Sequence, residues 1–446
     1  MGKTICTFFN NLRSHIVEVC SNRDNFEPYL ICTDEAERKK LFSRVRSWTL
    51  LRVVNAVLLC FKETLSTEII EFFLSKDKPS TTSEAYIKRR GFVSSLLFRD
   101  LNDWIINEMA DSQMAKTWKR GKYLCGIDGT RLSLPYTPEL YKLYRERDDK
   151  GHNLARGAFI TDLVNRVIIR ADIYPNKTEE RKASLELLTS GEFPYPLQST
   201  VFVMDRGYPS LQLMNWFNDN TAGFIIRARR DTNPQIAKFM DSNLKSTSVV
   251  LILSKNRRDI DYPCPKPLKV RLVKRPPIHN DDDQNDNEPV VFITNLDKSE
   301  FDDKTIASAY RMRWRSETEI GTEKNELQIE IFSGIRDICI RQDFYAAIIL
   351  YNIESIIRIP SNLKLKKHKG KEPIQVDLNQ TWQFTISLVN NLFGPQSELD
   401  AILTFTVNLY LRLYSVERPG RASPRNKRKI KVSGKYITFT NYKRAI

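Results

Sequence analysis

The first 118 residues carry apolar side chains at intervals of three and four, which is the spacing of amphipathic helices. The pattern predicts one helix over Leu41–Lys62 and a shorter one over Ser66–Leu74. The stretch SEAYIKRRGFVSSLLFRDLNDWIINEMA then predicts a basic helix, a break at Gly91 and a second amphipathic helix. Two interpretations remain open for this pair: a helix-turn-helix DNA module, and a plain helical bundle with a basic rim.

From Lys122 the pattern alternates with a period of two, which is typical of strands. The stretches KYLCGIDGTRLSLP, GAFITDLV and RVIIRADIYP predict a three-strand meander between residues 123 and 174. A helix over KTEERKASLELLTSG follows and is ended by Gly191. The apolar run TVFVM then predicts a central buried strand, and a helix over SLQLMNWFNDN and a strand over GFIIRAR come next.

Residues 230–300 predict a β-rich segment with strands over SVVLILS, LKVRLVKRP and VVFITNL. An acidic polar loop, NDDDQNDNE, separates the last two strands. Beyond this segment the pattern predicts a long helix over Asp302–Phe332 and another over Arg341–Ile357 that Pro360 stops. A further helical stretch is expected over Leu378–Tyr414.

The charge balance indicates the kind of partner. The 446 residues include 70 Lys and Arg against 54 Asp and Glu, which gives a net charge of +16. Part of the excess lies in a basic linker at 361–371 and in the end of the chain, which has no acidic residue after Glu417. Such a charge points to a polyanion, most often nucleic acid, although ribosomal, membrane-surface and acidic-protein binders share it.

The cysteine and apolar patterns exclude other classes. Seven cysteines and four histidines are dispersed without a CxxC pair, so we expect a reduced intracellular protein without a zinc site. The N-terminus has no long apolar core of a signal peptide. The most apolar stretch, Thr49–Phe61, contains Arg52 and Asn55 and is too short to span a bilayer. We therefore expect a cytoplasmic protein with no membrane partner.

Three carboxylates are candidates for chemistry because of their positions. Asp128 lies inside the first strand of the meander, Asp205 ends the buried run TVFVM, and Glu317 lies in the long helix after the β-rich segment. Taken singly, a strand-end aspartate is often a turn residue and a helical glutamate is usually solvated. The helix periodicity argues against that interpretation for Glu317.

At about 100° per residue, one side of the predicted helix is apolar and also carries charge. Its apolar members are Ile306, Trp314, Ile320, Leu327 and Ile331. On the same side lie Tyr310, Arg313, Glu317 and Lys324. Buried charges cost several kcal/mol unless they are paired or bound to a ligand, so a site or a buried salt-bridge network is expected there.

The spacing Tyr310-x2-Arg313-x3-Glu317-x6-Lys324 resembles the YREK signature of bacterial insertion-sequence DDE transposases, specifically the insertion-sequence-four family. The block YRMRWRSETEIGTEKNELQIEIFSG is similar to the family throughout, MDRGYPS resembles its second-aspartate block, and GIDGTRLSLP its first. The resemblance covers about 120 to 355.

The resemblance implies an α/β protein with an RNase H-like catalytic core that a β-rich insertion interrupts. The implied divisions are a helical N-terminal DNA-binding domain, a core in two pieces, an all-β insertion and a basic helical C-terminal region. They correspond to residues 1–118, 119–229 with 300–358, 230–299, and 359–446.

The resemblance also implies the site. The family's metal-binding triad falls on Asp128, Asp205 and Glu317, whose hard oxygen ligands suit Mg²⁺ or Mn²⁺, in two ions. Grips on DNA phosphates are implied for Tyr310, Arg313 and Lys324, and by extension for Arg206 and Tyr208 of the DRGY stretch. The implied partners are transposon-end and target double-stranded DNA, with a homodimer in the DNA complex.

Two departures from the family pattern are visible. Ser316 stands where the family usually has Ile before the helix glutamate, and Val290 stands where some members place a Trp for hairpin chemistry. The resemblance implies a cut-and-paste transposase. The alternatives left open are a transposase-derived DNA-binding protein without catalysis, and a metal-dependent nuclease with the same core.

Overall fold

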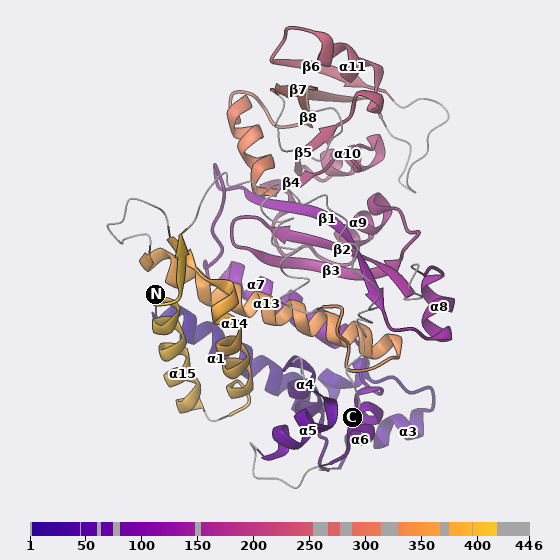
Figure 1. Cartoon of the computed structure of the whole chain (residues 1–446), viewed down its shortest axis with the longest axis vertical. Helices are drawn as coiled ribbons and strands as arrows, with labels where there is room; N and C mark the ends of the chain where they lie inside the picture. The colour runs from indigo at the N-terminus through magenta and orange to yellow at the C-terminus, as the bar shows by residue number, and fades with distance from the viewer. Residues whose placement is uncertain are drawn as a thin grey trace, which may run out of the picture.

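The centre of this computed structural model is one eight-stranded mixed sheet in the order β3-β2-β1-β4-β5-β8-β7-β6 (Figure 1). The strands are β1 Tyr123–Leu134, β2 Asn153–Asp162, β3 Val167–Pro175, β4 Thr200–Met204, β5 Gly223–Ala228, β6 Ser246–Leu251, β7 Leu268–Arg275 and β8 Val290–Thr294. The structure describes residues 2–44, 46–59, 64–74, 81–147, 153–252, 266–276, 288–313, 329–365, 374–394 and 396–416.

The predicted meander is confirmed, because β1, β2 and β3 are antiparallel neighbours. β4 is fully buried and central, as its apolar run predicts, and it lies parallel to both β1 and β5. The predicted helices between the strands also form, as α9 Glu180–Thr189 and α10 Leu211–Asp219. Parallel neighbours bring the carboxyl end of β4 beside the middle of the longer β1.

The β-rich segment continues the same sheet. β8 pairs with β5, and β7 and β6 follow as antiparallel neighbours. The expectation that 230–299 is all-β is wrong, because η3 Arg230–Thr232 and α11 Pro234–Asp241 lie within it. Asn233 caps α11 through its side chain and Pro234 occupies the first turn, which are local helix signals. Most of the acidic loop lies outside the described residues.

Helices dominate the N-terminal region, as predicted. They are α1 Gly2–Ser21, α2 Arg23–Phe26, η1 Glu27–Tyr29, α3 Glu35–Lys40, α4 Leu50–Leu58, α5 Leu65–Leu74, α6 Ser83–Arg90 and α7 Leu96–Asp111. The predicted helix over Leu41–Lys62 is wrong at its start. Phe42 is left-handed (φ 55°), and Thr49 caps α4 by accepting a hydrogen bond from the Arg52 N–H.

The α6–α7 pair agrees with the helical bundle of the two interpretations. α7 packs on α13 (Asp337–Leu365) and β3, and Asn102 Nδ2 donates to the carbonyl of Ile169 at 3.1 Å. α7 is therefore a packed member of this bundle, and DNA binding by the α6–α7 pair stays a prediction.

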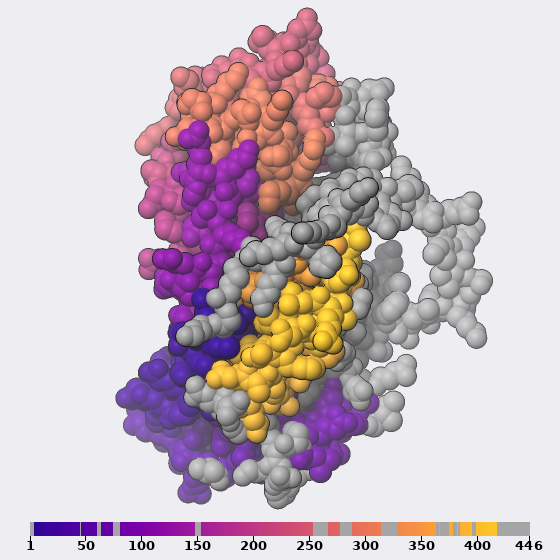
Figure 2. Space-filling model, turned by 90° about the vertical axis from the view of Figure 1, so that its left-hand side faces the viewer, coloured from indigo at the N-terminus to yellow at the C-terminus, as the bar shows by residue number. Residues whose placement is uncertain are grey.

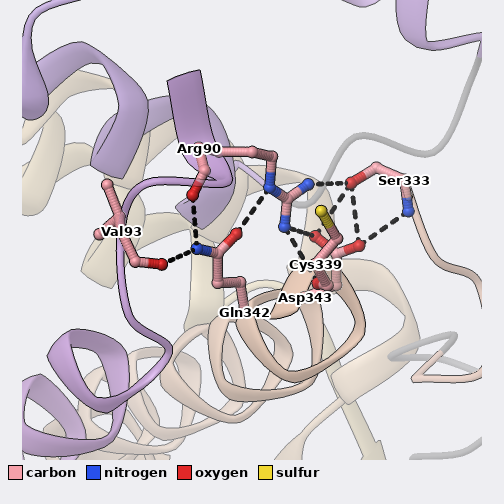
Figure 3. Close-up of polar contacts among 6 residues, drawn as sticks. All are labelled: Arg90, Val93, Ser333, Cys339, Gln342 and Asp343. Atoms are coloured by element: carbon pink, nitrogen blue, oxygen red, sulfur yellow. Dashed lines mark hydrogen bonds and ion pairs between the residues drawn. The ribbon is translucent and has the colours of Figure 1, made fainter. Parts of the chain in front are cut away.

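A buried polar cluster fixes α6 to α13 (Figure 3). The Arg90 side chain is 0% exposed and donates to Gln342 Oε1 and Asp343 Oδ1, each at 2.7 Å. It also donates to Ser333 Oγ and to the carbonyl of Cys339. Arg90 therefore joins the N-terminal helices to the segment that follows residue 328 from inside the protein.

Opposite faces of the sheet carry different helices (Figure 1). α9 covers β2, β3 and β1 on one face, and α7 and α13 cover β3 on the other. Residues 303–313 are helical and pack with Phe292 of β8 in a separate apolar cluster. The rest of the helix predicted over Asp302–Phe332 lies largely outside the described residues.

α13 runs through Pro360, so the prediction that Pro360 stops the helix is wrong. Pro360 lacks an N–H, but Ile356, Ile357 and Ser361 around it are buried, and Ser361 Oγ donates to the carbonyl of Ile357 at 3.3 Å. Burial of this helix thus outweighs the lost hydrogen bond.

The predicted helical stretch Leu378–Tyr414 is two helices, α14 Leu378–Asn391 and α15 Gln396–Tyr410, with Gly394 between them. A small second sheet pairs β9 Ile374–Val376 with β10 Tyr414–Val416. α14 and α15 lie on one side of the molecule beside the N-terminal helices (Figure 2). Much of the basic linker and all of 417–446 lie outside the described residues. Within the described part of the chain, no helix has the length and apolarity needed to cross a membrane.

Candidate active site at the end of β4

Asp128 and Asp205 lie side by side. β1 and β4 are paired in parallel from Tyr123↔Thr200 to Gly126↔Val203. Extending that register by two residues places Asp128 opposite Asp205. Backbones of neighbouring strands are about 4.8 Å apart. Two carboxylates separated by a long stretch of sequence therefore meet at the carboxyl end of β4, as their strand positions predict.

Backbone N–H groups orient both carboxylates. Asp128 Oδ1 accepts from the N–H of Gly129 at 2.8 Å, and Asp205 Oδ1 accepts from the N–H of Gly207 at 2.7 Å. A Cβ on Gly207 would lie 3.1 Å from Asp205 Oδ1 and 3.2 Å from Glu180 Oε2. Glycine therefore permits the turn after β4 to close tightly around these acids.

Arg313 reaches this pair from the helical segment 303–313. Its Nη1 lies 3.6 Å from Asp128 Oδ2, and its Nη2 donates to the hydroxyl of Tyr310 at 3.3 Å. The Arg313 side chain is 3% exposed and the Asp128 side chain 22%. The structure thus brings Tyr310 and Arg313 to the carboxylates, as the helix periodicity predicts. The apo protein already supplies Asp128 with a counter-charge.

Tyr310 is held between the helix and the sheet. Its ring packs on Phe292 with the centroids 4.8 Å apart. Burial raises the pKa of the Tyr310 phenol, while the nearby Arg313 and Arg227 oppose the rise. The phenol therefore stays neutral and remains a hydrogen-bonding group.

Tyr208 lies inside the protein, where its 1% exposure leaves no surface for phosphate. This burial disagrees with the expectation that Tyr208 grips DNA directly. Burial raises the pKa of its phenol well above the usual value, and the negative charges of Asp128, Glu180 and Asp205 raise it further. Tyr208 is therefore a neutral side chain that supports the acidic site from within. Arg206, by contrast, is partly exposed.

Glu317 and Lys324 lie outside the described residues, as do Ser316 and Trp314. Among the residues that the structure describes, no group of three acidic, histidine or cysteine side chains has the arrangement of a metal site. Two of the three predicted ligands, Asp128 and Asp205, are nevertheless adjacent and oriented. Paired carboxylate oxygens fit the ligand preference of Mg²⁺ or Mn²⁺.

Two residues near the acids were missed by the sequence analysis. Glu180 opens α9 and pairs with Arg156 of β2. Arg227 of β5 follows Ile226, the partner of Met204, so one further step of that register places Arg227 beside Asp205. The signal for Arg227 was available, since GFIIRAR is the next strand along the chain after TVFVM. No periodic pattern in the sequence distinguishes Glu180 from other charged residues.

Comparisons with known proteins identify the family of this chain. No curated protein sequence matches the chain. A solved structure described as the piggyBac transposase synaptic complex with hairpin DNA is 12% identical, with a TM-score of 0.44. That match covers 93% of this chain and 88% of the other. A family model described as "Transposase DDE domain" matches residues 119–353, which include Asp128, Asp205 and Arg313. Because that match spans more than half of the 446 residues, this chain belongs to the transposase DDE domain family.

Proposed function

We propose that this protein is a cut-and-paste transposase of an insertion sequence, with Asp128, Asp205 and Glu317 as its catalytic carboxylates. The observation that carries the proposal is the shared register of Asp128 and Asp205 on adjacent parallel strands. Arg313 contacts this pair, and Glu317 follows Arg313 by four residues in the sequence. The proposed substrates are transposon-end and target double-stranded DNA, acted on by a homodimer.

The three carboxylates would hold the divalent ions. When bound, Mg²⁺ or Mn²⁺ would lower the pKa of an attacking water or 3′-hydroxyl and stabilise charge on the scissile phosphate. The adjacent backbone N–H groups keep Asp128 and Asp205 oriented without metal, which lowers the entropic cost of assembling the site.

The cations would position the DNA. Arg206 is partly exposed beside Asp205, and Arg313 is within reach of both Asp128 and Tyr310. We propose that they and Lys324 contact phosphates near the transposon end, where arginine offers a two-pronged donor and lysine a point charge. Tyr310 and Tyr208 would serve by holding these side chains and the carboxylates in place.

The test uses duplexes that carry the terminal inverted repeats flanking the gene. Asp128→Asn, Asp205→Asn and Glu317→Gln should each abolish strand cleavage in Mg²⁺ and leave end binding close to wild type. A variant that cleaves at nearly the wild-type rate would remove that residue from the ligand set. Cleavage without joining to target DNA would favour the nuclease alternative. Binding without cleavage by the wild type would favour the non-catalytic one.

A further inference from the structure

A third carboxylate adjoins the two proposed catalytic aspartates. Glu180 opens α9, and its Oε2 lies 3.2 Å from the position of a Cβ on Gly207. Asp205 Oδ1 lies 3.1 Å from the same position, so the two oxygens are no more than 6.3 Å apart. Glu180 Oε1 lies 3.7 Å from the position of a Cβ on Gly129, the residue that follows Asp128. Glu180 is therefore close to both aspartates.

The acids reach this point from both faces of the sheet. Glu180 lies against Gly129 on the face that α9 covers. Because neighbouring residues of a strand point to opposite faces, Asp128 points to the other face, where Arg313 meets it. β4 ends at Met204, so the β1–β4 pairing stops just before Asp128. Side chains from the two faces can therefore approach each other past the end of β4.

Contacts on Glu180 orient one of its oxygens toward the site. Arg156 Nη1 lies 2.5 Å from Glu180 Oε1, which leaves Oε2 as the oxygen on the side of Asp205. The Glu180 side chain is 37% exposed, so water reaches it. Burial raises the pKa of the Tyr208 phenol, and the charges of Asp128 and the other two acids raise it further. All three acids therefore lie around one buried group.

The spacing suits a contact through water. Across the part of the chain that the structure describes, no three acidic, histidine or cysteine side chains are arranged to hold an ion directly. Mg²⁺ keeps several waters when one or two carboxylates bind it, and those waters need acceptors. An oxygen bound to the ion and an acceptor of a water on the same ion are roughly 4–6 Å apart. The limit on the separation of Glu180 Oε2 and Asp205 Oδ1 agrees with that range.

We propose that Glu180 is a positioning residue of the catalytic centre, which accepts a hydrogen bond from water on the divalent ion held by Asp128 and Asp205. This inference rests on the proposed function, of which the ion is a part. Such an acceptor orients the bound water and adds negative charge near the ion. Removal of a partner of this kind commonly weakens metal binding about 10–100-fold. Arg156 serves by holding Glu180 in place.

The first experiment follows free Mn²⁺ by its EPR signal while the ion is titrated into the protein, alone and with transposon-end DNA. Glu180→Gln keeps the size of the side chain and should bind Mn²⁺ roughly tenfold more weakly than the wild type. Glu186→Gln is the matched control, because it removes an equal charge from an exposed position of the same helix. This control should bind Mn²⁺ as the wild type does.

Arg156→Gln separates the carboxylate from the ion pair. It breaks the same pair as Glu180→Gln but keeps the carboxylate, and it removes a cation from the surroundings of the ion. Arg156→Gln should therefore bind Mn²⁺ at least as tightly as the wild type. Equal weakening in the two variants would show that the pair serves only the fold, and would overturn the inference.

Cleavage of transposon ends gives a second readout. High Mg²⁺ should restore most of the cleavage by Glu180→Gln, because the direct ligands of the ion remain. The same concentration should not restore cleavage by Asp205→Asn, which lacks a proposed ligand. A cleavage defect of Glu180→Gln that high Mg²⁺ leaves unchanged would contradict a contact through water.

The outcomes distinguish the two proposals. An unchanged Mn²⁺ affinity in Glu180→Gln overturns the inference, as does a loss of equal size in Glu186→Gln. A wild type that binds no Mn²⁺, with and without DNA, also overturns it. Failure of the wild type to cleave native ends overturns the proposed function instead, and the Mn²⁺ titrations then still decide the role of Glu180.

Discussion

The guanidinium of Arg313 stands 3.6 Å from the carboxylate of Asp128, although one comes from a helical segment and the other from the middle of β1. Asp128 also lies beside Asp205, so this cation offsets part of the repulsion between two adjacent acids. A divalent ion would offset the same repulsion. Arg313 and metal are therefore expected to substitute for each other in stabilising the site, and this exchange can be measured.

Replacing Arg313 by Gln should destabilise the metal-free protein by about 1–3 kcal/mol. The loss is below the range for a fully buried pair, because the Asp128 side chain is 22% exposed and water reaches it. Urea denaturation in EDTA and in Mg²⁺ measures the effect, and the deficit should shrink in Mg²⁺. An equal deficit under both conditions would show that Arg313 serves only the packing of its helix.

Asp205→Asn should instead stabilise the metal-free protein. Asn keeps the acceptor that receives the Gly207 N–H but removes one of two adjacent negative charges. In EDTA the variant should therefore be more stable than the wild type by about 1 kcal/mol, the usual sign where a functional site holds unfavourable charge. Thermal melts with and without Mg²⁺ should show that the wild type gains stability from the ion and that Asp205→Asn does not.

Asp231→Asn is the matched control, since Asp231 is an exposed acid in η3. Its melting temperature should respond to Mg²⁺ as the wild type does. If Asp205→Asn gains as much from Mg²⁺ as this control, Asp205 does not hold the ion.

The sequence predicts those site residues that lie in a local hydrophobic pattern, and it does not predict contacts between segments that share no pattern. Asp128 and Asp205 were predictable because strands β1 and β4 show in local alternation and in an apolar run. Arg313 was predictable because its helix has a periodic face. Arg156 and Glu180 meet across a strand and a helix with no shared period, so only the folded chain reveals their contact.

Long-range pairing limited the fold prediction in the same way. The strands β6, β7 and β8 were predicted individually, but their attachment to β5 depends on a register between β5 and β8 that no local pattern contains. The start of α4 was missed because the left-handed backbone at Phe42 outweighs a continuous apolar pattern.

Arg90→Ala should destabilise the protein by about 3–5 kcal/mol, because it leaves the partly buried Asp343 without its cation and the buried Gln342 without its donor (Figure 3). Arg89→Ala is the control, since the Arg89 guanidinium lies over the Phe42 ring at 4.9 Å and Arg89 is only half-buried. Arg89→Ala should cost less than about 1 kcal/mol in urea denaturation. Similar losses in the two variants would contradict the role of the Arg90 cluster as the joint between α6 and α13.

A pH dependence is expected from Asp103, which lines a cavity of about 30 Å³ together with Arg99, Arg170, Asp172, Tyr174 and Tyr345. Burial raises the pKa of Asp103 to about 6 from an ordinary 3.8, although Arg170 and Arg99 oppose the rise. Asp100 nearby adds to it. The folded protein therefore holds this proton across a range of pH in which the unfolded chain has released it.

The sign follows from proton binding. Below about pH 4 both states are protonated, and between about pH 4 and pH 6 the folded state binds more protons, so stability falls as pH rises. Above pH 6 the loss in the free energy of unfolding no longer changes with pH. It is at most about 3 kcal/mol, because the pKa of Asp103 is about two units higher in the folded protein than in the unfolded chain. Asp103→Asn cannot ionise, so relative to the wild type it should gain stability from pH 4 to pH 8. Urea denaturation of both proteins across this range measures the gain. A difference that does not change with pH would show that Asp103 ionises in the folded protein as it does in the unfolded chain.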